Sequence, residues 1–118
     1  MAIMQLTEII SKLKLVIKTQ TGDLSREVTG GYSSDLLSDV IANAREGDLW
    51  ITLQTHQNTI AVASMKNLSG IVLVNNRQPE SDTLIKAREE DIPILISDLP
   101  AFELIGRLYN LGISGVDK

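Results

Sequence analysis

The chain has 118 residues, the length of a single domain, and it contains no cysteine. Disulfide bonds, thiolate zinc sites and cysteine nucleophiles are therefore excluded. The net charge is −4, from 15 acidic residues against 11 lysines and arginines, and the aromatic residues are one Trp, one Phe and two Tyr. This composition argues against binding to nucleic acid or to an anionic membrane surface. Because the first residues do not resemble a signal peptide and no apolar run approaches the ~20 residues of a membrane span, we expect a cytoplasmic protein.

The first half of the chain alternates helical and extended patterns. We expect a helix capped by Thr7, a strand at 15–17, a turn at 21–23, an extended segment at 26–29 that ends at Gly30-Gly31, a helix capped by Ser33 or Ser34, and a strand at 49–53. Trp50 lies in this last strand, so we expect it to pack in the core.

The second half repeats the alternation. We expect a deeply buried helix at 59–65, a strand at 71–74, a helix that starts at Pro79, a strand at 92–96, a helix opened by Asp98 and Pro100 and ended by Gly112, and a short edge segment at 113–116. Short apolar strands separated by helices are typical of a mainly parallel sheet. The sequence therefore predicts one three-layer α/β domain over residues 1–118, with a mainly parallel sheet flanked by helices.

Several kinds of chemistry have no motif in this sequence. Neither Gly30-Gly31 nor Gly70 leads to a Walker A ending, the Rossmann fingerprint is missing, and the single histidine, His56, cannot form a His-His metal pair. An enzyme would have to rely on His56 and Asp98 without a visible nucleophile. We therefore expect neither catalysis nor a metal nor another cofactor.

Polar residues follow each of the expected strands. In parallel α/β sheets, ligands bind beyond the carboxyl ends of the strands, where loops lead into helices. The residues expected to meet there and form a ligand-binding crevice are Thr29, Gly30, Gly31, Thr55, His56, Asn75, Asn76, Arg77 and Asp98.

Each of these residues also has a purely structural interpretation. The glycines permit a tight turn, the asparagines tolerate a left-handed backbone, and His56 can cap the following helix. Arg77 can hold a phosphate or a carboxylate, or it can simply be solvated.

The order of these segments resembles the DRTGG-domain family. The resemblance rests on 28–37, 46–52, 68–73, Pro79-Glu80 and 92–95, and it covers most of the chain. That family accompanies CBS modules, occurs in phosphotransacetylases and is similar to the N-terminal domain of HPr kinase/phosphorylase. Stand-alone members are named as serine-kinase-like and occur beside iron-hydrogenase genes. The resemblance implies a regulatory or ligand-binding role, an adenine nucleotide as ligand, and self-association as a homodimer.

The sequence departs from the namesake motif of that family. The stretch 27–31 keeps only Thr29-Gly30-Gly31, and if the motif belongs to the later loops, Thr55-His56 and Val74-Asn75-Asn76 stand in its place. The Asp-Arg pair is missing in both alignments, so an anion site that depends on that arginine would have to be rebuilt here, with Arg77 as the candidate.

Two functions remain open. The first is a non-catalytic, ligand-sensing regulatory domain that binds a small anion or an adenine nucleotide in the crevice. The second is a homo-oligomeric interaction module that docks on a hydrogenase or another redox enzyme without a small-molecule ligand. It is favoured by the apolar content of the last helix, in Phe102, Ile105, Leu108, Tyr109 and Leu111.

Overall fold

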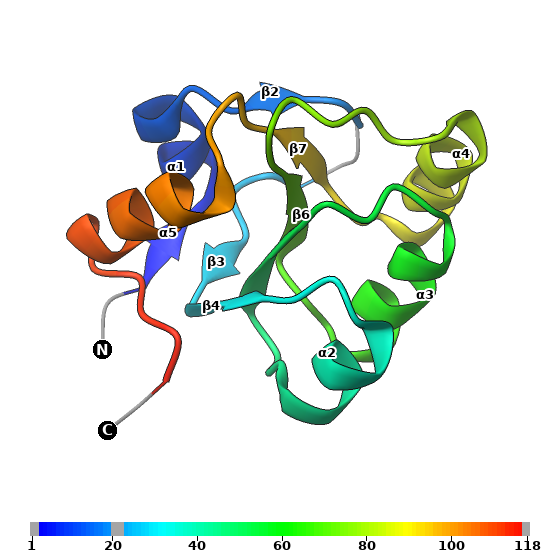
Figure 1. Cartoon of the computed structure of the whole chain (residues 1–118), viewed down its shortest axis with the longest axis horizontal. Coiled ribbons are helices and arrows are strands. Elements are labelled where there is room, and N and C mark those ends of the chain that lie inside the picture. The colour runs from blue at the N-terminus through cyan, green and yellow to red at the C-terminus, as the bar shows by residue number, and fades with distance from the viewer. Residues whose placement is uncertain (1–2, 20–22, 117–118) are drawn as a thin grey trace.

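The computed structural model describes residues 3–19 and 23–116. Its centre is a five-stranded sheet in the order β2-β7-β6-β5-β4, in which β4 to β7 run parallel and β2 pairs antiparallel with β7 (Figure 1). The strands are β1 Met4–Gln5, β2 Val16–Ile17, β3 Glu27–Val28, β4 Gly30–Ser33, β5 Asp48–Thr52, β6 Gly70–Leu73 and β7 Ile94–Ile96. The helices are α1 Leu6–Leu13, α2 Leu37–Asn43, α3 Asn58–Met65, α4 Ser81–Glu90 and α5 Ala101–Asn110. The expected α/β fold class with a mainly parallel sheet is confirmed.

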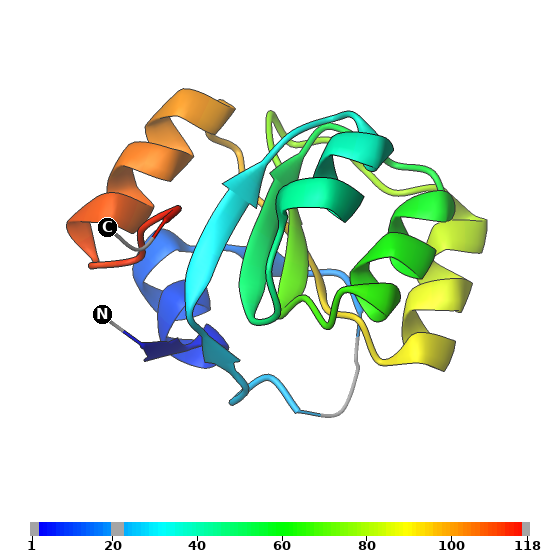
Figure 2. The same cartoon turned by 90° about the horizontal axis from the view of Figure 1, so that it is seen from below.

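The helices cover both faces of this sheet. Helices α2, α3 and α4 lie on one face and α1 and α5 on the other, as the views in Figures 1 and 2 agree. Successive residues of β5 point to opposite faces, so Trp50 joins the first layer while Leu49 and Ile51 join the second. β1 and β3 form a separate two-stranded antiparallel ladder beside α1.

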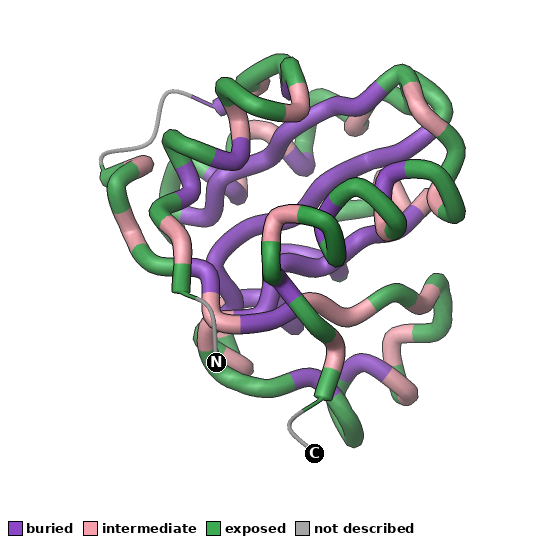
Figure 3. Tube along the Cα trace, turned by 90° about the vertical axis from the view of Figure 1, so that its left-hand side faces the viewer, coloured by how far each residue is buried: buried purple, intermediate pink, exposed green. Residues whose placement is uncertain are grey.

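The central strands are buried along their whole length (Figure 3). Strands covered on both faces need apolar side chains on both sides, which explains the unbroken apolar runs in the sequence. Trp50 is fully buried, as expected, and its indole N–H donates a hydrogen bond to the carbonyl of Ser34 at 2.8 Å.

Several local expectations were wrong. Thr7 is not a cap, because α1 already begins at Leu6 and the Thr7 N–H donates to the carbonyl of Leu24 at 2.9 Å. α4 begins at Ser81, two residues after Pro79. α3 is buried on one side only, since Met65 is 61% exposed. Of the expected turn, Thr21 and Gly22 lie outside the described residues.

The segment after α5 follows the free edge of β4. It forms no strand, but the carbonyl of Ser114 accepts a hydrogen bond from the N–H of Gly31 at 3.3 Å. The expected edge segment therefore lies beside β4 and is joined to it by one hydrogen bond among the described residues. Across the two described ranges, no helix is long and apolar enough to cross a bilayer.

Candidate functional site

Three loops meet at the carboxyl end of the sheet. They follow β5, β6 and β7, and they carry six of the predicted site residues, which we call the carboxyl-end rim: Thr55, His56, Asn75, Asn76, Arg77 and Asp98. The last two loops are joined by hydrogen bonds from the N–H of Asn75 to the carbonyl of Leu99 and from the N–H of Asn76 to the carbonyl of Ser97.

The first loop of the rim is tied to α4. The buried hydroxyl of Thr83 donates to the carbonyl of Thr55 at 2.7 Å, and the N–H of Glu80 donates to the same carbonyl at 3.3 Å. Because all three loops are cross-linked in this way, the rim is a continuous surface whose backbone groups are largely engaged with one another.

Most rim side chains have a structural role. His56 accepts a hydrogen bond from the N–H of Asn58 at 3.1 Å through Nδ1, which caps the start of α3. Asn75 and Asn76 both have φ of 55°, the left-handed conformation that asparagine tolerates better than most residues. Arg77 differs, because its exposed guanidinium makes no hydrogen bond or ion pair with any described residue. Arg77 is thus the rim residue that is open to an external anion.

The remaining predicted residues do not join this rim. Gly30 and Gly31 form the start of β4 rather than the turn after it. Thr29 and Gly30 therefore lie at the amino end of the sheet, away from the carboxyl-end rim. The expectation that all nine residues form one crevice was therefore wrong. The physical reason is that these glycines permit close packing inside a strand, not a reversal of the chain.

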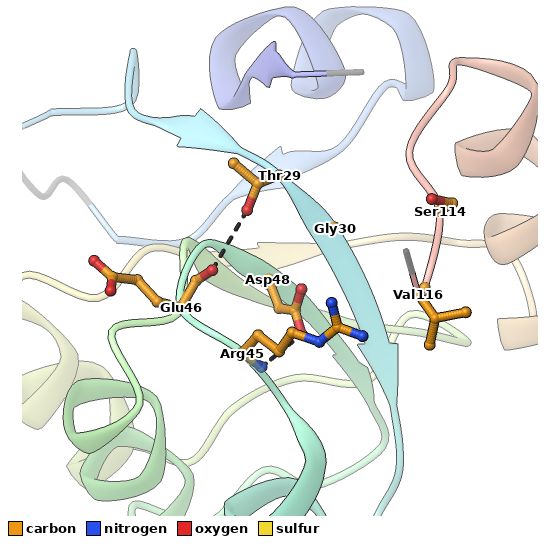
Figure 4. A pocket seen from close by; sticks show the side chains of 8 residues that line it. Thr29, Gly30, Arg45, Glu46, Asp48, Ser114 and Val116 are labelled. Atoms are coloured by element: carbon orange, nitrogen blue, oxygen red, sulfur yellow. Dashed lines mark hydrogen bonds between the residues drawn. The ribbon is translucent and has the colours of Figure 1, made fainter. Parts of the chain in front are cut away.

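A cavity of about 200 Å³ opens at the amino end of the sheet (Figure 4). We call it the amino-end pocket, and the residues that line it are Thr29, Gly30, Arg45, Glu46, Asp48, Ser114, Gly115 and Val116. No residue of the carboxyl-end rim lines the amino-end pocket or three further cavities of the described structure. The amino-end pocket is therefore a recess separate from the rim.

Asp48 forms the floor of the amino-end pocket. It is the first residue of β5 and only 5% exposed. Its Oδ2 accepts a hydrogen bond from the N–H of Arg45 at 2.8 Å, while Oδ1 has no hydrogen-bond partner among the described residues. Burial raises the pKa of the Asp48 carboxyl, against the N–H of Arg45 and the charges of Arg45 and Lys66, which act to lower it.

Two further residues shape this pocket. The hydroxyl of Thr29 points toward the carbonyl of Glu46 at 3.4 Å, and Figure 4 shows the Arg45 side chain beside Asp48, with its guanidinium reaching toward β4. The Arg45 guanidinium makes no ion pair within 4.0 Å to any described carboxylate. The pocket therefore holds an acid and a base that are not paired with each other.

Asp48 and Arg45 were missing from the sequence-based site. Asp48 directly precedes the apolar run 49–53, and a charged residue in that position is a signal for a carboxylate at the start of a buried strand. That Gly30 lies opposite Asp48 could not be read from the sequence, because it depends on the pairing of β4 with β5.

Comparison with known proteins gives a structural match. No family model and no curated protein match the sequence. Among solved structures, the chain is similar to the CBS and DRTGG domains of the regulatory region of the Clostridium perfringens pyrophosphatase, complexed with its activator diadenosine tetraphosphate. The TM-score is 0.70 at 15% sequence identity, over 88% of this chain and 45% of that one.

The fold is DRTGG-like. In this DRTGG-like fold, the stretch Thr29-Gly30-Gly31 runs into a strand, whereas Thr55-His56 and Val74-Asn75-Asn76 lie in neighbouring loops on the rim. This chain spans less than half of the matched regulatory region, and at this level of identity the similarity concerns the fold.

Proposed function

We propose that this chain is a non-catalytic regulatory domain that senses a small anionic ligand, such as an adenine nucleotide, at its carboxyl-end rim. The observation that carries the proposal is the unpaired guanidinium of Arg77, which is presented by a loop that is cross-linked to its neighbour. A planar guanidinium binds phosphate oxygens with two parallel hydrogen bonds. The structurally similar pyrophosphatase region is regulatory and was solved with a nucleotide activator, which agrees with such a role.

The start of α4 supports the same ligand class. This helix begins four residues after Arg77, and no side chain caps its first backbone N–H groups, although Glu80 and Asp82 place negative charge at the same end. His56 has a structural explanation, because its Nδ1 accepts a hydrogen bond from the backbone N–H of Asn58 at the start of α3.

The test is a thermal-shift screen with ATP, AMP, diadenosine tetraphosphate and acetyl phosphate. Binding to the folded state raises the melting temperature, and ~1 kcal/mol of binding energy corresponds to a shift of several degrees. We expect Arg77→Gln to abolish the shift and Arg88→Gln, an exposed arginine near the other end of α4, to preserve it. A screen with no shift above about 1 °C, or equal shifts in the two variants, would contradict the proposal.

A second function is favoured by one feature of α5. Phe102 is 92% exposed and Tyr109 is 54% exposed on this helix, and Val116 beside it is 50% exposed. Exposed aromatic side chains of this kind mark protein–protein contacts. An interaction module that self-associates through α5 is therefore the alternative, and light scattering of the wild type and Phe102→Ser tests it. A monomer at high concentration would contradict it.

The remaining assignments stay predictions. These are a single domain over residues 1–118, a cytoplasmic location, and association with a hydrogenase or another redox enzyme.

A further inference from the structure

The amino-end pocket contains a buried carboxylate with a free oxygen. Asp48 is only 5% exposed, yet its carboxylate accepts just one hydrogen bond from the described residues, from the N–H of Arg45 to Oδ2. Buried carboxylates are normally paired or fully hydrogen-bonded. A buried charge without a partner loses its hydration, which lowers the stability of the folded state by roughly several kcal/mol. Oδ1 therefore has the capacity to accept a hydrogen bond from a ligand.

The backbone of β4 packs closely beside this oxygen, and glycine at position 30 makes this possible. A Cβ atom on Gly30 would lie 2.7 Å from Asp48 Oδ1 and 3.1 Å from the carbonyl oxygen of Ser114. A side chain at position 30 would therefore clash with the free oxygen, and glycine allows β4 and the carboxylate to lie side by side. The neighbouring Gly31 has no such restriction, since its Cβ would meet only the carbonyl of Leu49 at 3.6 Å.

The positively charged side chain of Arg45 lines the same pocket without forming an ion pair with Asp48. Its charge nevertheless acts on Asp48. The pocket therefore offers one acceptor for a positive group and one donor for a negative group, with the hydroxyls of Thr29 and Ser114 at its walls. The partner that satisfies both groups is a small zwitterion.

The other ligand classes fit less well. A multivalent metal ion would need further ligands, and within the described ranges no group of three His, Asp or Glu side chains is placed to hold one. A bare anion would be repelled by Asp48 and Glu46. The volume of about 200 Å³ is below the ~300–1,000 Å³ of pockets for drug-sized ligands.

We propose that the amino-end pocket binds a free α-amino acid, with its ammonium group on Asp48 Oδ1 and its carboxylate on the guanidinium of Arg45. This site lies at the amino end of the sheet, whereas the rim lies at the carboxyl end, and it does not depend on the function proposed for Arg77.

The experiment is an NMR titration of the full chain with each of the twenty amino acids. Methylamine serves as a probe with the ammonium group alone, and acetate as a probe with the carboxylate alone. We expect at least one amino acid to shift the amide signals of Gly30, Arg45, Asp48 and Gly115, and to bind at least tenfold more tightly than either probe. The proposal is overturned if no amino acid shifts these signals, or if methylamine binds as tightly as the best amino acid.

Matched variants identify the residues responsible. Arg45→Gln changes an exposed side chain and should weaken amino-acid binding about tenfold or more, as the loss of one charge-assisted contact of ~1.4 kcal/mol or more implies. Asp48→Asn retains the shape and an acceptor for the N–H of Arg45, and it should weaken binding similarly. Arg88→Gln and Arg77→Gln should bind the amino acid as the wild type does. Unchanged binding in Arg45→Gln would overturn the proposal, and loss of nucleotide binding in Arg77→Gln alone would separate the two sites.

Discussion

Gly30 and Asp48 lie opposite each other in the parallel register of β4 and β5, and a Cβ atom on Gly30 would approach Asp48 Oδ1 to 2.7 Å. We expect Gly30→Ala to destabilise the protein by about 1–3 kcal/mol, the usual cost of forcing extra volume into a packed site. Urea unfolding measures the change.

Gly31→Ala is the matched control for this substitution. Its Cβ would make only an ordinary contact at 3.6 Å, so the change in unfolding free energy should stay within about 0.5 kcal/mol. Equal losses in the two variants would show that strand geometry, and not the carboxylate of Asp48, requires glycine at position 30.

The pH dependence of stability should reveal the buried Asp48. Burial raises the pKa of its carboxyl in the folded state, so the folded protein is stabilised by protonation and loses that stability as the pH rises through the raised pKa. We expect Asp48→Asn to be more stable than the wild type at pH 7, with a difference that shrinks as the pH falls toward 3.8, the ordinary value. Thermal melts from pH 3 to pH 8, without ligand, measure this difference.

Asp39 provides a control of opposite sign. Hydrogen bonds from Ser34, Tyr32 and Asn43 lower the pKa of the Asp39 carboxyl, and the Tyr32 hydroxyl lies 2.9 Å from its Oδ1. Its contribution is present above the ordinary pKa and is lost as the pH falls through the lowered one. Asp39→Asn should therefore destabilise at pH 7 and change little at the lowest pH. The same sign for both variants would contradict the assigned environments.

Asn75 should contribute to the stability of the folded state through its left-handed backbone conformation. Its φ of 55° is costly for a residue with a Cβ, by roughly 1 kcal/mol or more, but not for glycine. We expect Asn75→Ala to lower the unfolding free energy by about 1 kcal/mol and Asn75→Gly to leave it nearly unchanged. If both variants lost the same stability, the side chain of Asn75 and not its backbone would be what the loop needs.

The two ends of the sheet differed in how well the sequence predicted them. The apolar runs 71–74 and 92–96 identified buried parallel strands, because burial on both faces leaves few alternatives for their residues. The loops after those strands lie at one end of the sheet because the strands run parallel. Gly30-Gly31 was misplaced because a glycine pair fits both a turn and a crowded strand, and only the long-range partner Asp48 distinguishes the two.

Helix α5 should show the contrast between buried and exposed apolar residues. Leu104 is fully buried, and Leu104→Ala should cost about 2–5 kcal/mol. Phe102 is 92% exposed, so Phe102→Ala should change the unfolding free energy by less than about 0.5 kcal/mol. A large loss in Phe102→Ala at high protein concentration, but not at low, would indicate that the side chain is buried between copies of the chain.

The segment from Ser114 to Val116 lines two neighbouring cavities, the amino-end pocket and a more apolar groove of about 260 Å³ along β4 and α5. Among the described residues, two hydrogen bonds hold this segment, from the Gly31 N–H to the Ser114 carbonyl and from the Gly115 N–H to the Tyr109 hydroxyl. Because the same short backbone segment lines both cavities, a ligand bound in one cavity should reduce the backbone motions that allow a ligand to enter the other. Slower deuterium uptake at Gly31 and Gly115 on filling the pocket would be the signature of that thermodynamic linkage.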